Sequence, residues 1–113
     1  MPPSSHQLAE AKRIARALSE VGFCLPGTLL ERYLRCRSPG CHCKAEPPQL
    51  HGPYWYWTRK VNAKTVSRVL SAEQAEEYQT WFDNERTLRQ LMKELEELSM
   101  DVADADPRWP KRR

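Results

Sequence analysis

The sequence has few glycines and no long apolar run. Four glycines among 113 residues are too few for a glycine-rich phosphate-binding loop, and no nucleophile–base pair stands out, so we expect that the protein is not an enzyme. No apolar stretch approaches the roughly 20 residues that span a bilayer. The N-terminus also lacks the basic start and apolar run of a signal peptide. We therefore expect a cytoplasmic protein with no membrane partner.

The chain is short and carries four cysteines. Its length fits one small domain with a thin core, because small chains bury a smaller fraction of their surface. A bound metal ion would stabilise such a chain. In a reducing cytoplasm, clustered thiols serve metal binding better than disulfides. Since 40% of the residues are apolar, the composition indicates a folded protein.

Charge is unevenly distributed along the chain. Residues 27–70 contain eight Lys and Arg against two Glu, a net charge of +6, whereas residues 71–106 contain three basic residues against eleven acidic ones, a net charge of −8. A basic segment favours a polyanionic partner, and an acidic segment favours solvent or a protein partner. The simpler interpretation, in which both charged faces are only solvated, stays open.

The order of the patterns predicts an α+β fold with a short N-terminal helix, a small antiparallel sheet of two or three strands with a zinc knuckle, and a long C-terminal helix. Ser4 and Gln7 fit a capping box that starts the first helix, whose apolar residues repeat at steps of three and four. The predicted segments are an amphipathic helix in 1–21, a zinc-knuckle and β-hairpin module in 22–70, a long helix in 71–100 and a flexible basic tail in 101–113.

Two segments are clearly predicted to be strands, and a third is ambiguous. The aromatic run Tyr54–Arg59 and the segment 64–70 predict a hairpin, joined by a turn at Asn62, a residue type that tolerates positive φ. The spacing of apolar residues in 28–35 fits a helix or a strand. Because this segment is short and follows a Pro-Gly turn, we favour a strand.

The long helix carries a leucine seam in its second half. From residue 72 to 100 it would be about 40 Å long, more than the diameter of about 26 Å expected for a compact domain of this size, so the second half needs a partner of its own. That partner is the first helix of the same chain, antiparallel, or a second copy in a homodimer through 85–102. The seam residues are Leu88, Leu91, Leu95 and Leu98, followed by Val102.

Three thiols and one imidazole fall within sixteen positions, enough to surround one tetrahedral zinc ion. Three cysteines in eight positions around a Pro-Gly turn are unusual for core filling, which argues against unliganded packing residues. The predicted zinc ligands are Cys36, Cys41, Cys43 and His51. For the fourth position, Cys24, His42 and water are the alternatives to His51.

The hairpin combines aromatic and basic residues, which predicts contact with nucleic acid. A basic two-stranded ribbon fits the major groove of DNA, and exposed rings stack on single-stranded bases. The competing interpretation is that the tryptophans are core residues and that the basic residues protect the sheet edges. The candidate contact residues are Arg35, Arg37, Trp57, Arg59, Lys60, Lys64 and Arg68.

Residues 22–100 resemble a family of small prokaryotic proteins of unknown function. The resemblance is carried by Leu25-Pro-Gly-Thr-Leu29, by the C-x4-C-x-C pattern from Cys36 to Cys43, by His51-Gly-Pro-Tyr54 and by the long helix. It implies a metal-binding module with His51 as a ligand, often encoded beside transposases or other mobile-element genes. This chain departs from the family at Ala63, where a Gly is expected before Lys64.

These features together predict a small zinc-binding accessory protein, associated with mobile elements, that reads DNA or RNA through its hairpin. The alternative is a protein-interaction adaptor or dimerisation module that works through the Leu-seamed helix. In that alternative the zinc ion is purely structural.

Overall fold

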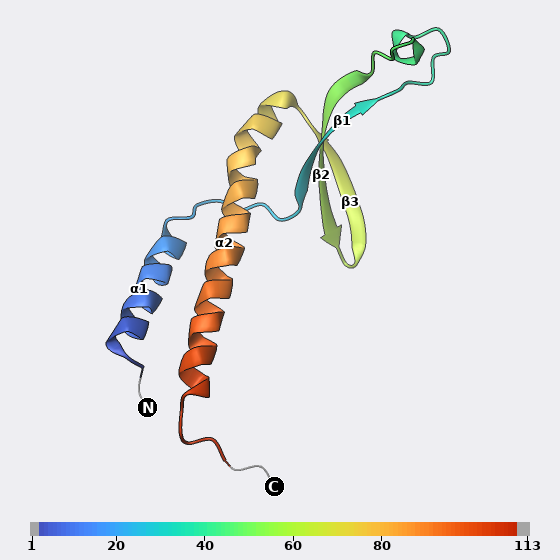
Figure 1. Ribbon diagram of the computed structural model, residues 1–113. Helices are drawn as coiled ribbons and strands as arrows, with labels where there is room; N and C mark the ends of the chain where they lie inside the picture. The colour runs from blue at the N-terminus through green and yellow to red at the C-terminus, as the bar shows by residue number, and fades with distance from the viewer. Residues whose placement is uncertain (1–2, 111–113) are drawn as a thin grey trace. The chain divides into compact units, whose positions relative to one another are not determined.

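The computed structural model describes residues 3–110, which form two helices and one three-stranded antiparallel sheet (Figure 1). The predicted α+β class is confirmed, and the ambiguous segment after Gly27 is a strand, as favoured. None of the described helices is long and apolar enough to cross a bilayer. In chain order the elements are α1 (Ser5–Ser19), β1 (Thr28–Leu34), the 3-10 helix η1 (His42–Lys44), β2 (His51–Val61), β3 (Lys64–Leu70) and α2 (Ala72–Asp104).

The described chain divides into two compact units, and α2 contributes to both. The helical unit contains 3–24 and 84–110, and the sheet unit contains 25–83. The sequence predicts one domain instead. The reason for the difference is the length of α2, because a sheet of this size can cover only its first turns. The rest of α2 finds its apolar partner in α1.

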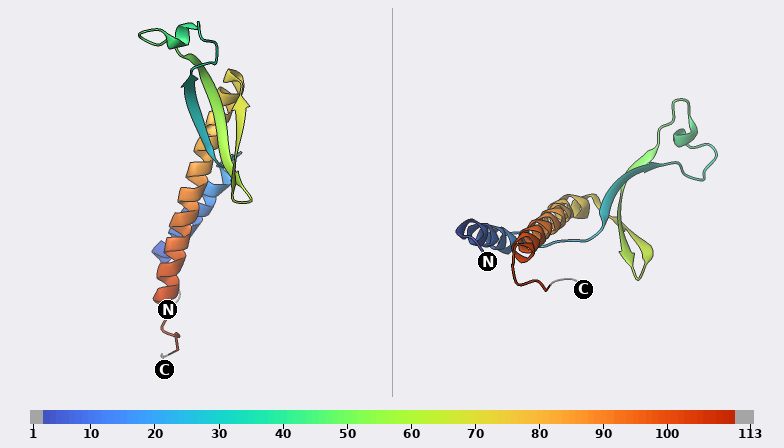
Figure 2. Two further views of the ribbon diagram at one scale, coloured as in Figure 1. Left: turned by 90° about the vertical axis from the view of Figure 1, so that its right-hand side faces the viewer. Right: turned by 60° about the horizontal axis from the view of Figure 1, so that its bottom comes forward.

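In the helical unit, α1 lies antiparallel beside α2, as the views in Figures 1 and 2 agree. The predicted capping box starts α1, since the Ser4 hydroxyl accepts from the Gln7 amide at 3.1 Å. Ile14 of α1 is 2% exposed and Leu91 of α2 is 9% exposed. At the other end of the pair, the Asn84 side chain donates to the Phe23 carbonyl at 2.8 Å. The leucine seam therefore has the partner predicted within the same chain.

Helix α2 also begins at a capping box, where the Ser71 hydroxyl accepts from the Gln74 amide at 3.1 Å. It continues past the predicted end at residue 100 to Asp104. Beyond it, the Trp109 indole donates to the Ala103 carbonyl at 2.7 Å. The segment predicted as a flexible tail is therefore helical at its start and held at Trp109, while 111–113 lie outside the described residues.

The sheet has the strand order β1–β2–β3, with β2 in the centre. Trp55 pairs with Leu70 and Trp57 with Arg68, so the predicted hairpin of Tyr54–Arg59 with 64–70 is confirmed. Strand β1 starts opposite Thr58. Beyond that residue, β2 and β3 continue alone as a two-stranded ribbon to their turn.

The core of the sheet unit lies between one face of the sheet and the first turns of α2. Trp57, Leu70 and Phe82 form it, with rings of Trp57 and Phe82 edge to face at 6.0 Å between centroids. Trp57 is 8% exposed, and its indole donates to the Pro26 carbonyl at 2.8 Å. Trp57 as a nucleic-acid contact is therefore wrong, because its ring fills the core and its only donor is used there.

The β2–β3 turn places Asn62 at φ 51° and Ala63 at φ 66°. Two consecutive positive φ values define a type I′ turn, which matches the right-handed twist of a hairpin. Asn tolerates this region, but the Cβ of Ala does not fit it well. The position at which the sequence departs from the expected Gly is therefore a strained one.

The substitution Ala63→Gly should raise the free energy of unfolding of the sheet unit by about 1 kcal/mol. The reason is that a non-glycine residue in the left-handed region is unfavourable by about 1–2 kcal/mol. Urea unfolding followed by tryptophan fluorescence measures this change. The control is Ala45→Gly, at an exposed alanine with φ −73°, which should instead lower stability by up to about 1 kcal/mol. Equal effects at both positions would contradict the assignment of strain to the turn.

Candidate metal centre

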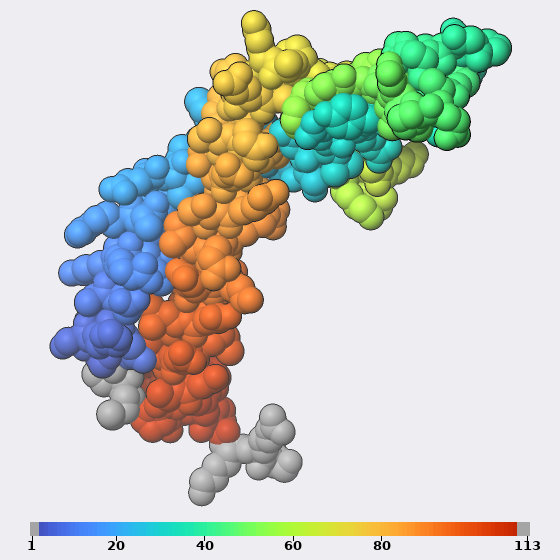
Figure 3. All heavy atoms as spheres, turned by 45° about the horizontal axis from the view of Figure 1, so that its top comes forward, coloured from blue at the N-terminus to red at the C-terminus, as the bar shows by residue number. Residues whose placement is uncertain are grey.

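A knuckle of irregular chain, residues 35–50, connects β1 to β2 and carries the predicted ligands. Cys36 follows the last residue pair of β1, Cys41 is the N-cap of η1, Cys43 lies within η1, and His51 is the first residue of β2. In Figure 3 this segment, in green, protrudes beyond the strands that it joins. All four side chains therefore come from one connection and its two ends.

The four predicted ligands are the residues that the structure brings together. One ligand atom from each of Cys36, Cys41, Cys43 and His51 lies within 4.8 Å of all the others. The Cys36 and Cys43 sulfurs are 3.6 Å apart, and the Cys41 sulfur is 3.1 Å from the His51 Nε2 atom.

These separations fit a tetrahedral metal ion. With metal–sulfur bonds of about 2.3 Å, two sulfurs of a tetrahedral site are about 3.8 Å apart, and a sulfur and an imidazole nitrogen about 3.5 Å apart. The sulfur pair is close to that edge length, and the sulfur–nitrogen pair needs only a few tenths of an ångström more. Cys43 is fully buried and the other three ligands are half-buried. The cluster can hold a metal ion in a closed, protein-lined site.

Backbone turns and one lysine hold the knuckle in shape. The Cys41 amide donates to the Ser38 carbonyl at 3.2 Å, and the Cys36 amide donates to the Cys43 sulfur at 3.4 Å. The Lys44 ammonium donates to the carbonyls of Cys36 and Ser38. Sequence reasoning did not single out Lys44, and its position next to Cys43 is the only signal that could have done so.

The electrostatics of the knuckle favour a thiolate at Cys36. The Ser38 amide, the Cys41 thiol and the His51 ring donate hydrogen bonds that lower the pKa of Cys36 to about 6. At Cys41 the Cys43 amide lowers the pKa, but burial and the neighbouring thiols raise it by more, so its net shift is upward. Metal ions bind the thiolate form, so binding of the ion must displace the protons of the other cysteine thiols.

The two alternative side-chain ligands lie outside the cluster. The His42 ring nitrogen Nδ1 is 3.7 Å from the Cys41 sulfur, and its ring packs edge to face against His51 at 5.0 Å. It supports the ring of the ligand and is not one of the four donors. Cys24 belongs to the helical unit, where its thiol lies 3.5 Å from the Gly22 carbonyl.

The predicted nucleic-acid residues do not form one patch. Arg35 and Arg37 are exposed at the knuckle end of β2, while the other basic candidates lie along the hairpin and toward its turn, up to about 33 Å of strand away. Arg59 is half-buried, with its guanidinium 4.7 Å from the centre of the Trp57 ring. The remaining exposed candidates are Lys60, Lys64 and Arg68.

The fold and the site define a small α+β protein with a Cys3His cluster that can hold a metal ion. Residues 6–80 match the model of a domain of unknown function, DUF6788, and the chain belongs to this family. The matched span includes α1 from its second residue onward, the whole sheet and all four cluster residues, but only the first turns of α2. The chain has no significant match among curated proteins or solved structures.

Cys43→Ser should reduce the bound metal from about one ion per chain to near zero, because it removes the most buried of four ligands. Since metal binding and folding are coupled in such sites, circular dichroism should show loss of the sheet. Elemental analysis of protein purified without chelator gives the metal content. The matched control is Cys24→Ser, which should keep the metal. Full metal content in Cys43→Ser would contradict this site.

Proposed function

We propose that the protein is a small zinc-stabilised accessory module that binds nucleic acid through the basic β2–β3 ribbon. The observation that carries the proposal is the Cys3His cluster, whose ligand atoms lie within 4.8 Å of one another. The cluster lies within residues 27–70, the segment with a net charge of +6. Association with mobile elements and a cytoplasmic location stay predictions from the sequence.

Zinc is the metal that suits this donor set best. Three thiolates and one imidazole are soft to borderline ligands, and the tetrahedral arrangement they support is typical of structural zinc. Zinc with three thiolates carries a net charge of −1. The Lys44 ammonium, held on the carbonyls of Cys36 and Ser38, supplies a compensating positive charge close to the cluster.

A structural role fits the number of ligands. Catalytic zinc keeps one coordination position open for water or substrate, whereas four protein side chains complete the tetrahedron here. We therefore place the working surface of the protein away from the metal and assign no catalytic role to it.

The ribbon beyond Thr58 supports contact with a polyanion. It is two-stranded there, and Lys60 and Lys64 are exposed on either side of the turn. Among the described residues of β2 and β3 there is no Asp or Glu, so nothing in these strands neutralises the basic side chains. A narrow basic ribbon is one of the shapes that enters a DNA major groove.

Binding to a DNA duplex should therefore depend strongly on salt. Lys60→Gln combined with Lys64→Gln should reduce the slope of log affinity against log salt concentration by about 2, because each lost phosphate contact removes about 0.9. Fluorescence anisotropy over a range of salt concentrations measures the slope. The control is Lys12→Gln combined with Arg16→Gln, two exposed residues of α1. Wild-type affinity weaker than about 10⁻⁴ M at low salt for both a duplex and a single strand would exclude the proposed function.

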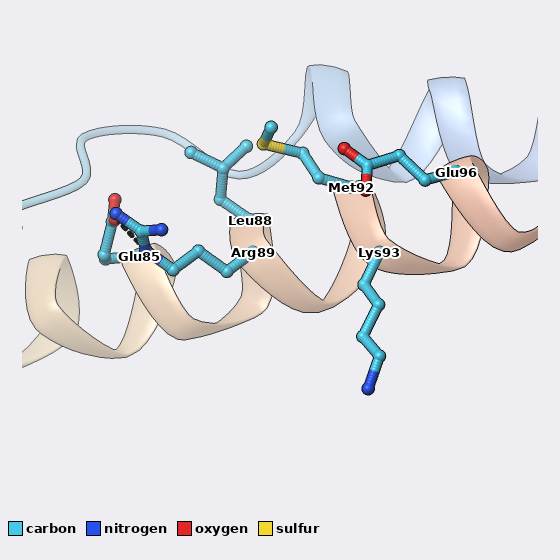
Figure 4. Close-up of a pocket in the computed structure, with 6 residues that line it drawn as sticks. All are labelled: Glu85, Leu88, Arg89, Met92, Lys93 and Glu96. Atoms are coloured by element: carbon cyan, nitrogen blue, oxygen red, sulfur yellow. Dashed lines mark hydrogen bonds and ion pairs between the residues drawn. The ribbon is translucent and has the colours of Figure 1, made fainter.

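A second candidate function, as a dimerisation or adaptor module, is favoured by apolar surface in the helical unit. A groove of about 240 Å³ between α1 and α2 is lined by Leu8, Ala11, Leu95, Leu98 and Val102, among others. Leu8 is 53% exposed at this groove. Elsewhere on α2, Leu88 and Met92 point to the same side of the helix while Lys93 points away (Figure 4), and Met92 is 47% exposed.

If a second copy covers this groove, Leu8→Glu should convert a dimer to a monomer in sedimentation equilibrium, because a buried unpaired carboxylate is strongly unfavourable. Leu8 suits the test better than Leu91, which is buried within the chain itself. Lys12→Glu on the same helix, at an exposed position, should leave the dimer intact. A wild type that stays monomeric up to about 0.1 mM would rule out dimerisation of useful strength.

A further inference from the structure

The sheet has a second face, which the core does not use. Strand alternation places Leu30 and Arg32 of β1, the even-numbered residues of β2 from Tyr54 to Lys60, and Thr65, Ser67 and Val69 of β3 on this side, which we call the open face. The core residues Trp57 and Leu70 lie on the other side, against Phe82 of α2. Within the described sheet unit, no helix covers the open face.

Side chains on the open face are accessible to a ligand. Tyr54 is 40% exposed and Val69 is 63% exposed. Tyr56 is half-buried, and Arg32 and Lys60 are exposed. Two phenol rings, two cations and several hydroxyl groups therefore share one surface. None of the described residues on this face is acidic, since Glu31 points to the opposite side and accepts from the Tyr33 hydroxyl at 3.0 Å.

Arg32 and the two tyrosines form a connected group. Arg32 is the cross-strand partner of Tyr54, and its guanidinium lies 5.6 Å from the centre of the Tyr56 ring. The cation and both rings are thus held together by the β1–β2 register. Aromatic rings and guanidinium planes are the two kinds of surface on which unstacked bases lie.

The spacing of the rings suits a chain of nucleotides. Side chains two residues apart on a strand are about 6.7 Å apart, close to twice the rise of about 3.4 Å between stacked bases. Two neighbouring bases that no longer stack on each other can each lie on one ring. The bases of a duplex cannot, because their flat faces are covered by their neighbours.

Resting on the proposed function, the geometry points to a single-stranded nucleic acid as the ligand of this protein, bound on the open face with bases stacked on Tyr54 and Tyr56. Arg32 at one end and Lys60 toward the turn bind its phosphates, about 20 Å apart along β2 to judge from the strand rise. The hydroxyls of Thr58 and Ser67 lie between these ends, Thr65 lies opposite Lys60, and all three supply donors and acceptors for the base edges. The basic turn is then the end of the same binding path.

The test compares Tyr54→Leu combined with Tyr56→Leu against the wild type, using a labelled thymidine single strand of about 12 nucleotides and a duplex of the same length. Leucine keeps apolar bulk but removes the ring face. We expect the affinity for the single strand to fall at least about tenfold, since each stacked base contributes a factor of about 5 or more, with little change for the duplex. The matched control is Tyr33→Leu, at an exposed tyrosine outside the open face.

The outcomes separate this inference from the proposed function. If the wild type binds both probes and the double variant keeps its single-strand affinity within about twofold, the loss is smaller than the contribution of one stacked base. The open face is then not the site, and the proposed function stands. If the wild type binds neither probe, both fail. A fall in affinity for both probes alike would also overturn the open-face assignment.

Cross-linking to the wild-type protein tests the same site without any substitution, so its result does not depend on whether the double variant folds. A thymidine strand carrying photoreactive 5-iodouracil should cross-link to Tyr54 or Tyr56 in the wild-type protein with its metal bound. Fragment spectra of the modified peptide distinguish these residues from Trp55 between them. Cross-links found only on Trp109 or Tyr33, which are also exposed, would overturn the inference.

Discussion

The sheet unit depends on the closure of one connection, the knuckle between β1 and β2. Its apolar core is small, with Trp57, Leu70 and Phe82 as its central residues, and such a core gives little stability to a unit of about sixty residues. A metal ion held by the three cysteines of the knuckle and by His51 would fix the end of β1 against the start of β2. The β1–β2 register at this end of the sheet would follow from that constraint, while the turn at Asn62 and Ala63 sets the β2–β3 register.

The sign of the charge changes at the start of α2, inside the sheet unit, because Glu73, Glu76, Glu77 and Asp83 belong to that unit. The basic residues of 27–70 lie in the sheet unit, and most of the acidic residues of 71–106 lie on α2. Acidic side chains on a helix repel a polyanion, so they restrict where on the chain it can bind. With three thiolates, a zinc-bound cluster would carry a net negative charge at the knuckle. The Lys44 ammonium lies close enough to offset that charge.

Local signals in the sequence predicted most of the elements and the whole cluster. The capping box at Ser4, the aromatic strand and the spacing of the three cysteines each depend on residues a few positions apart. The division into two units could not be predicted in this way, because it depends on which surfaces α2 covers. The same holds for Trp57, whose burial is decided by Phe82 and Pro26 from distant parts of the chain. Lys44 was missed because its partners are carbonyl groups.

The two faces of the sheet explain why the tyrosines, and not the tryptophans, are available to a ligand. Both residue types alternate along β2, so one must point to α2 and the other away from it. Tryptophan has the larger apolar surface, and its single donor is satisfied by one carbonyl, so it suits the core. Tyrosine has an apolar ring and a hydroxyl that can remain in water, so it suits a surface that is exposed until it is bound. Alternation alone predicts that the faces differ, but only the packing of Phe82 against Trp57 decides which of them stays open.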